Sequence, residues 1–217
     1  LPDADLVGKL YVLDFLKETS ELLVFNDVPR RQFLSYEFML SLAKSYGIDL
    51  QSQLYLFANE RGDYGFVIPL INSTKLDDAF ERIQNNFDVS DTLIGSDKVF
   101  EIKDESIYFF KREKFAFFYK GNYFNDVYNQ LSNSSGVIRD SWEKLFSNQY
   151  FVNEKLVVYT KSAPLNNLGI NHMFLAHDSD STEFYLKSRI VMNDSIPFLI
   201  NEEGKTINYS EKSLLFL

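Results

Sequence analysis

Hydrophobic and polar residues alternate along residues 97–121, in three short aromatic runs separated by polar pairs. The separating pairs are Asp104-Glu105 and Arg112-Glu113. A period of two, many aromatic side chains and two-residue polar breaks are typical of a tight antiparallel meander. Apolar residues occupy both faces of these strands, which predicts that part of the second face is covered. The alternating apolar positions are Phe100, Ile102, Ile107, Phe109, Phe115, Phe117 and Tyr119.

Strand patterns also occur outside this region. Residues 6–13 form a nearly continuous apolar run, which predicts a buried strand. Residues 54–59 and 64–70 flank Arg61-Gly62-Asp63, and this arrangement predicts a hairpin around a polar turn. Residues 156–160 predict a further strand. A second long hairpin is predicted over residues 170–177 and 183–192.

Helix patterns lie between these strands. Residues 32–46 carry apolar side chains at three- and four-residue spacing, and Gly47 suits the left-handed position that follows a helix. A second helix is predicted behind Thr74, which with Asp77 resembles a weak capping box. Its apolar stripe consists of Leu76, Phe80 and Ile83. Two shorter helix patterns cover residues 125–131 and 138–146.

These elements predict an α+β fold. An antiparallel sheet, built from hairpins and a three-strand meander, is expected to carry helices mainly on one face. The polar loop at residues 132–136 suggests a boundary between an α+β half, residues 1–132, and a smaller half, residues 137–217, packed on the first. One continuous domain is the alternative.

An internal similarity suggests that the two halves are related. Residues 56–60 align without gaps on residues 174–178, and residues 66–68 then fall on residues 184–186. Both segments are apolar strands around a polar turn of equal length. Duplication explains this match, and so does the general likeness of any two hairpins, because short repeats are weak signals.

Composition narrows the classes of partner. The chain has 217 residues, of which 45% are hydrophobic and 24% charged, as in ordinary globular proteins. Its net charge of −9, without a basic patch, makes nucleic acid an unfavourable partner. The absence of cysteine excludes thiol catalysis and thiolate metal sites. No apolar stretch is long enough to span a bilayer. The start at Leu1 without Met fits a cleaved export signal or a trimmed chain, and we favour export.

Candidate chemistry is sparse. The acidic loop at residues 178–183 follows an apolar run, as does the aspartate pair of haloacid-dehalogenase-type phosphatases. That fold needs α/β units after the motif, whereas a strand pattern continues here, so a hairpin turn is the better interpretation. A carboxylate- or metal-dependent hydrolase that uses Asp178, Asp180 and Glu183 remains the alternative function. His172 and His177, five residues apart on one strand, should point to opposite faces and are interpreted as structural.

Surplus aromatic residues suggest a binding function instead. Tyr108, Phe110 and Phe118 would mark a partner or ligand surface if they are exposed together, and would belong to the core if they are buried. No convergent catalytic set, cofactor fingerprint or metal site is predicted. The sequence therefore predicts a non-catalytic binding or interaction module for an unknown protein or small-molecule ligand.

One resemblance adds a location. The N-terminal segment Pro2-Asp3-Ala4-Asp5 leads into the strand Leu10-Tyr11-Val12, and Gly65-Phe66-Val67-Ile68-Pro69-Leu70 precedes the helix at Leu76-Asp77-Asp78-Ala79-Phe80. This pattern, over about the first 120 residues, resembles uncharacterised exported or lipid-anchored bacterial envelope proteins with a domain of unknown function. The resemblance implies a periplasmic or cell-envelope location, with any lipid anchor outside the given chain. It implies no catalytic residues.

Overall fold

The computed structural model of the chain describes residues 4–17, 38, 40–86, 88–132, 146, 153–179 and 184–192. The strands of this part are β1 (Leu6–Tyr11), β2 (Gln53–Ala58), β3 (Tyr64–Pro69), β4 (Val89–Ile94), β5 (Asp97–Ile102), β6 (Ile107–Arg112), β7 (Phe115–Lys120), β8 (Leu156–Thr160), β9 (Ile170–Ser179) and β10 (Phe184–Met192). Its helices are α3 (Ser73–Asn86), α4 (Phe124–Ser132) and α6 (Ala163–Asn167), with a 3₁₀ turn at Lys103–Glu105. Residues 12–17 and 40–45 are also helical.

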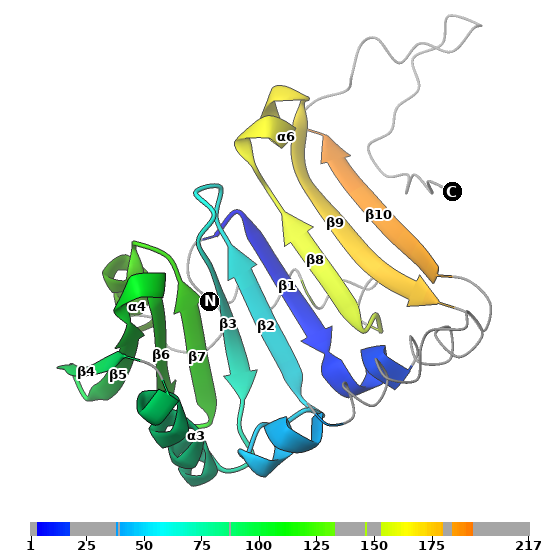
Figure 1. Cartoon of the computed structure of the whole chain (residues 1–217). Helices are drawn as coiled ribbons and strands as arrows, with labels where there is room; N and C mark the ends of the chain where they lie inside the picture. Colours follow the sequence, from blue (N-terminus) through cyan, green and yellow to red (C-terminus); the bar gives the residue numbers. More distant parts are fainter. Residues whose placement is uncertain are drawn as a thin grey trace, which may run out of the picture.

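All ten of these strands form one antiparallel sheet, in the order β10-β9-β8-β1-β2-β3-β7-β6-β5-β4 (Figure 1). The α+β class, the hairpins and the three-strand meander are therefore confirmed. No helix among the described residues combines the length and the apolar composition needed to cross a bilayer. Sequence patterns did not predict β4, half of whose residues are polar, or the short helix α6.

A three-strand meander, β8–β10, joins the other seven strands of the sheet through β1. β1 pairs antiparallel with β8, so strands on both sides of the expected boundary belong to a single sheet. The gapless alignment of the two hairpins is not reproduced by their registers. Leu56 pairs with Phe66, whereas Phe174, its aligned counterpart, pairs with Arg189. Phe184, the counterpart of Phe66, instead pairs with Ser179.

The two long helices cover opposite faces of the sheet at one end, which corrects the expectation of helices mainly on one face. Phe80 of α3 contacts the rings of Phe100 and Phe109, at centroid distances of 5.0 and 4.9 Å. Phe110, the next residue of β6, contacts Tyr128 of α4 at 5.4 Å. Adjacent strand residues point to opposite faces. We call these faces the α3 face and the α4 face.

Each helix closes a separate hydrophobic core. The α3 core is small and consists of Leu70, Leu76, Phe80, Phe100, Phe109 and Ala116. The α4 core is larger and extends along the sheet from β5 to β9. It includes Val7, Phe57, Val67, Val99, Phe110, Phe117, Tyr119, Phe124, Tyr128, Val157, Tyr159, Phe174 and Ala176. The α4 face is thus apolar and covered over most of its length.

Local turn chemistry agrees with the sequence except at one helix start. Gly47 adopts a positive φ of 80° after the helical residues 40–45, as predicted. The Oδ1 atom of Asn72 accepts hydrogen bonds from the backbone N–H groups of Thr74 and Lys75, at 2.9 and 3.3 Å. Asn72 therefore caps α3, and the predicted capping box of Thr74 and Asp77 is wrong. Residues 32–37 and 138–145 of two predicted helices lie outside the described residues.

Candidate binding surfaces

The three aromatic residues predicted as an interaction surface do not lie together. Phe110 is 1% exposed and belongs to the α4 core, so its ring is not part of a surface. Tyr108 is half-buried on the α4 face, two residues before Phe110 on the same strand. Phe118 pairs with Phe109 and therefore lies half-buried on the opposite, α3 face. Two different sites follow from these positions, one on each face.

The site on the α3 face is a row of directly paired residues that crosses β9, β8, β1, β2, β3 and β7. We call this row the open row, and it consists of Leu175, Val158, Gly8, Leu56, Phe66 and Phe118. Gly8 is buried and has no side chain, and the other five residues carry apolar side chains that are half-buried. None belongs to either hydrophobic core of the described residues. The row is therefore an apolar strip of sheet that neither long helix covers.

The position of α3 decides where the open row begins. The same line of paired residues continues from Phe118 to Phe109 and Phe100. These last two rings are buried because Phe80 of α3 packs on both. Beyond Phe118 the row keeps its apolar character but loses this cover. The face of an antiparallel sheet that stays in water normally carries polar residues. The open row carries apolar residues instead.

Aromatic rings concentrate at one end of the open row. The ring centroids of Phe66 and Phe118 lie 5.8 Å apart, and Tyr64 lies 6.0 Å from the first and 6.4 Å from the second. The Tyr64 side chain is 39% exposed. Tyrosine and phenylalanine are both enriched at protein interfaces, and tyrosine is enriched among the residues that contribute most to binding.

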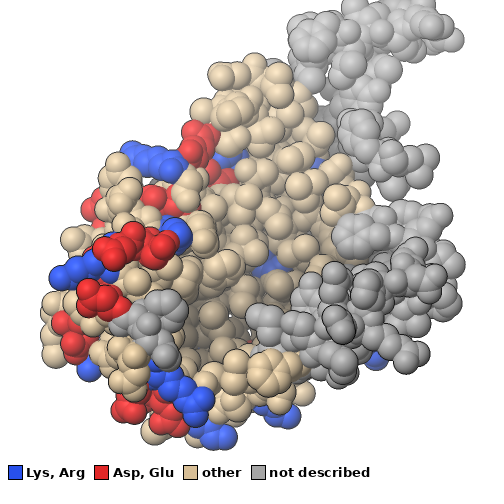
Figure 2. All heavy atoms as spheres, in the orientation of Figure 1, with Lys and Arg blue, Asp and Glu red and all other residues tan. Residues whose placement is uncertain are grey.

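Charged side chains lie away from the open row. Figure 2 shows the α3 face, with acidic and basic groups gathered over the end that carries α3 and mostly uncharged side chains over β1, β2 and β8. Three ion pairs on this face join strands to each other, to α3 or to the 3₁₀ turn. They are Lys98–Asp91, Lys111–Asp77 and Lys120–Glu105, with N–O distances of 2.9, 2.5 and 3.1 Å. Charged side chains therefore do not surround the open row.

The site on the α4 face is a polar pocket of about 570 Å³ at the start of α4. Its floor includes Glu101 and Tyr108, which pair directly across β5 and β6. The Tyr108 hydroxyl donates to Oε1 of Glu101 at 2.9 Å. Phe124 stacks on the Tyr108 ring, with a centroid distance of 4.3 Å and an interplanar angle of 8°. The remaining lining residues are Ser90, Asp91, Thr92, Ile94, Val99, Lys103, Asn122, Tyr123, Asn125 and Asp126.

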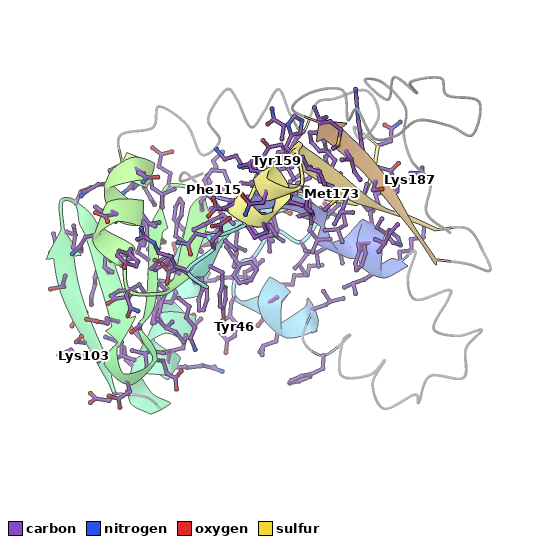
Figure 3. All side chains as sticks on the ribbon, turned by 90° about the horizontal axis from the view of Figure 1, so that it is seen from above. Tyr46, Lys103, Phe115, Tyr159, Met173 and Lys187 are labelled. Carbon is purple, nitrogen blue, oxygen red and sulfur yellow. The ribbon has the colours of Figure 1, made fainter. Side chains whose placement is uncertain are left out.

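The electrostatics of the pocket keep Tyr108 protonated. Burial and, after it, the hydrogen bond to Glu101 raise the pKa of the Tyr108 hydroxyl. Asp91 at the rim is paired with Lys98, which lowers the pKa of the Asp91 carboxyl. Lys103, also at the rim, lies at the opposite end of the sheet from Lys187 (Figure 3). The pocket therefore combines hydrogen-bond donors and acceptors with charged groups of both signs among its lining residues.

A buried ionic network holds α4, and so the pocket wall, on the sheet. Asp97 is 7% exposed, and its Oδ2 atom accepts from Nε of Arg112 at 2.8 Å. The Tyr128 hydroxyl lies 3.0 Å from the same oxygen and 2.6 Å from the carbonyl of Ile94, so its single proton serves one of them at a time. Nη1 of Arg112 donates to the carbonyl of Leu131, 3.3 Å away in the last turn of α4.

The two histidines occupy opposite faces, as predicted. His172 contacts the rings of Tyr159 and Phe174, members of the α4 core, at 5.3 and 5.6 Å. Burial and then the Arg189 charge lower the pKa of His172. His177 is 1% exposed and meets the edge of the Phe15 ring at 4.9 Å. They cannot share one metal ion from these positions.

The residues of the hydrolase hypothesis are not brought into a described site. Asp178 lies near the end of β9, while Asp180 and Glu183 fall outside the described residues. The described residues contain no group of three or more His, Cys, Asp or Glu side chains that could hold a metal ion.

Sequence reasoning identified one residue of each site, Phe118 and Tyr108, and missed the others. The open row draws single residues from strands far apart in the sequence, and the non-local pairings β1–β8 and β3–β7 align them. The pocket depends on where α4 returns over β5 and β6, which periodicity does not reveal. Its one local signal is the polar series Asn122, Asn125 and Asp126 around the start of a predicted helix.

Comparison with known proteins supports the fold alone. No protein-family model and no curated protein matches this chain. Three crystal forms of a protein named TP0453 have similar structures. Form I has a TM-score of 0.53 at 11% identity, covering 89% of this chain and 77% of TP0453. Form III has a TM-score of 0.52 at 10% identity, covering 91% and 80%. Form IV has a TM-score of 0.52 at 11% identity, covering 93% and 82%.

Proposed function

We propose that this protein is a non-catalytic interaction module, and that the open row on the α3 face binds a protein partner. The observation that carries the proposal is the unbroken apolar line from Leu175 to Phe118, which belongs to neither core. Apolar side chains aligned on a sheet face that neither long helix covers are suited to contact another molecule.

The energy available at this surface supports a specific contact. Full burial of a Leu, Val or Phe side chain stabilises by about 1.5–3 kcal/mol relative to full exposure. The five side chains of the open row are half-buried already, so a partner gains part of that amount from each. The sum, on the order of several kcal/mol, must still exceed the entropic cost of association. The aromatic end of the row, at Phe66 and Phe118, is where we expect the largest contribution.

The chemistry of the row indicates what kind of protein would bind. Residues that share the row's face on β1, β2 and β8 are uncharged, and the acidic and basic groups on that face gather around α3. A partner would therefore present an uncharged apolar surface rather than a charged segment. Electrostatic steering would contribute little, and the association should depend weakly on salt.

We place this module in the bacterial envelope, as an exported protein with any lipid anchor outside the given chain. The support is the N-terminal resemblance described above, over about the first 120 residues. Fractionation of cells that express the complete gene product tests the location. Recovery with the envelope fractions is expected, and recovery in the cytosol with an unprocessed N-terminus would contradict it.

Photo-crosslinking tests the partner. The photoreactive residue p-benzoylphenylalanine would replace Phe118, and in a matched control would replace Leu168, which is 67% exposed in the turn after α6. After irradiation of intact cells, a discrete heavier adduct is expected from position 118 and not from position 168. Adding Leu56→Glu should abolish the adduct, because it places a charge in the row.

Three outcomes would overturn the proposal. They are the absence of an adduct, adducts of equal yield at both positions, and survival of the adduct in the Leu56→Glu protein. An adduct of twice the chain mass would instead identify a second copy as the occupant. Circular dichroism of each purified variant confirms that the fold is retained.

A further inference from the structure

We propose that the pocket at the start of α4 binds a neutral saccharide, independently of the open row. The pocket lies on the α4 face, and the open row lies on the α3 face. A partner on one face therefore leaves the other accessible. Its volume of about 570 Å³ falls within the usual range for small-molecule sites, about 300–1,000 Å³.

The floor of the pocket offers an ordered hydrogen-bonding surface. Ser90, Glu101 and Tyr108 form one cross-strand row over β4, β5 and β6. The hydrogen bond from Tyr108 to Oε1 of Glu101 fixes that carboxylate without using all of its acceptor capacity. A carboxylate held in this way can accept hydrogen bonds from adjacent hydroxyl groups of a ligand.

The wall supplies both donors and acceptors. Asn122 and Asn125 flank the first turn of α4, and an amide side chain offers two N–H donors and one acceptor oxygen. Thr92 adds a hydroxyl from the edge strand β4. A ligand hydroxyl also both donates and accepts, so a lining of mixed polarity suits a polyhydroxylated molecule better than an ion.

Aromatic rings complete the wall. Phe124 stacks on Tyr108, and Tyr123 beside it is 43% exposed. The Arg61 guanidinium, from the β2–β3 hairpin, lies 4.5 Å from the centroid of the Tyr123 ring and orients it. An exposed ring with a polar tip provides an apolar contact for the C–H groups of a sugar while its hydroxyl stays wet.

The charge balance argues against charged ligands. Asp91 is already paired with Lys98, and Lys103 lines the pocket together with Glu101 and Asp126. A phosphate group would find one lysine among the lining residues, facing three carboxylates. A cation would face the positive end of the α4 dipole. The excess of carboxylates thus disfavours an anion and the helix dipole disfavours a cation, which leaves a neutral ligand as the best match.

Titration followed by two-dimensional amide NMR tests this proposal. The full chain would be titrated with maltose, lactose and chitobiose, and separately with inorganic phosphate and spermidine. At least one disaccharide is expected to shift the Asn122 and Asn125 signals, including their side-chain amides. Glu101→Gln should weaken that binding by about tenfold, because it removes a charged acceptor. Asn125→Ala should weaken it as well, whereas the matched control Asn166→Ala, in α6, should leave it unchanged.

Either of two results would overturn the saccharide assignment. One is a set of pocket signals that move with phosphate or spermidine and not with any of the disaccharides. The other is saccharide binding that survives Glu101→Gln and Asn125→Ala, or that falls equally in Asn166→Ala. Retained dispersion of the amide spectra shows that each variant folds, so that a loss of binding reports on the pocket. The crosslinking result at position 118 is unaffected by either outcome.

Discussion

Gly65 illustrates how one residue is constrained by the ring packed over it. It lies on β3 between Phe57 and Tyr119, whose rings stack at a centroid distance of 6.5 Å. A Cβ atom at this position would lie 2.3 Å from Cζ of Phe57 and 2.6 Å from the backbone oxygen of Phe118. Strand glycines commonly mark such close approaches.

Gly65→Ala should therefore lower the free energy of unfolding by about 1–3 kcal/mol, because the methyl group overpacks the core. The matched control is Gly8→Ala, another strand glycine, whose Cβ would have its nearest contact with the side chain of Leu56, at 2.9 Å. Leu56 lies on the open row and can move. Urea denaturation should show a clearly smaller loss for Gly8→Ala, and equal losses would contradict the assignment of Gly65.

Tyr119 should make stability depend on alkaline pH. Tyr119 is only 3% exposed, and this burial is the main cause that raises the pKa of its hydroxyl to about 12. In the unfolded chain this group ionises near pH 10. Its contribution is therefore complete below pH 10 and is lost as the pH rises towards about 12.

Denaturation curves at pH 9 and pH 11 test this dependence. The free energy of unfolding should be lower at pH 11 than at pH 9. The decrease should be smaller in the Tyr119→Phe variant, because this substitution removes the group that ionises. The pKa values of Tyr108, Tyr128 and Tyr159 are also raised, so a smaller decline persists in the variant. An identical decline in both proteins would show that Tyr119 ionises normally.

At the scale of elements, α4 depends on the pairing of Arg112 with Asp97. Arg112→Ala leaves a carboxylate that is 7% exposed without its guanidinium partner, and breaking such a pair costs about 3–5 kcal/mol. We expect a loss of that order in urea denaturation. The double variant Asp97→Asn with Arg112→Met should recover part of it. Lys120→Ala breaks the more exposed pair with Glu105 and should cost under about 1 kcal/mol. Comparable losses in both single variants would contradict a structural role for the network.

At the scale of the whole molecule, the seam between β1 and β8 should make the sheet one cooperative unit. Val7 and Val157 are 0% exposed on either side of this seam, and both belong to the α4 core. Val157→Ala creates a cavity there and should cost about 1–3 kcal/mol. Hydrogen exchange should then accelerate in β2 and β3 as well as in β8 and β9. Faster exchange confined to β8–β10 would show that the two parts of the sheet unfold separately.

The short elements were predictable because their signals are local. Alternation in β5, β6 and β7 follows from the two-residue repeat of a strand, and Gly47 marks a helix end by its positive φ. The cap of α3 was misassigned because Thr74 and Asn72 can both cap a helix, and the sequence does not say at which of them the helix begins. β4 escaped notice because an edge strand in water needs few apolar residues.

The sequence by itself determined most of the strands, where the hairpins turn and that the protein is α+β, because these depend on neighbours within a few positions. Only the tertiary structure decided that β1 joins β8 and that α3 and α4 pack on opposite faces. It also decided that the apolar row ends in a core at Phe109 but lies open from Phe118 onwards. The reason is that these contacts join residues far apart in the chain, and their partners are chosen by packing, not by local period.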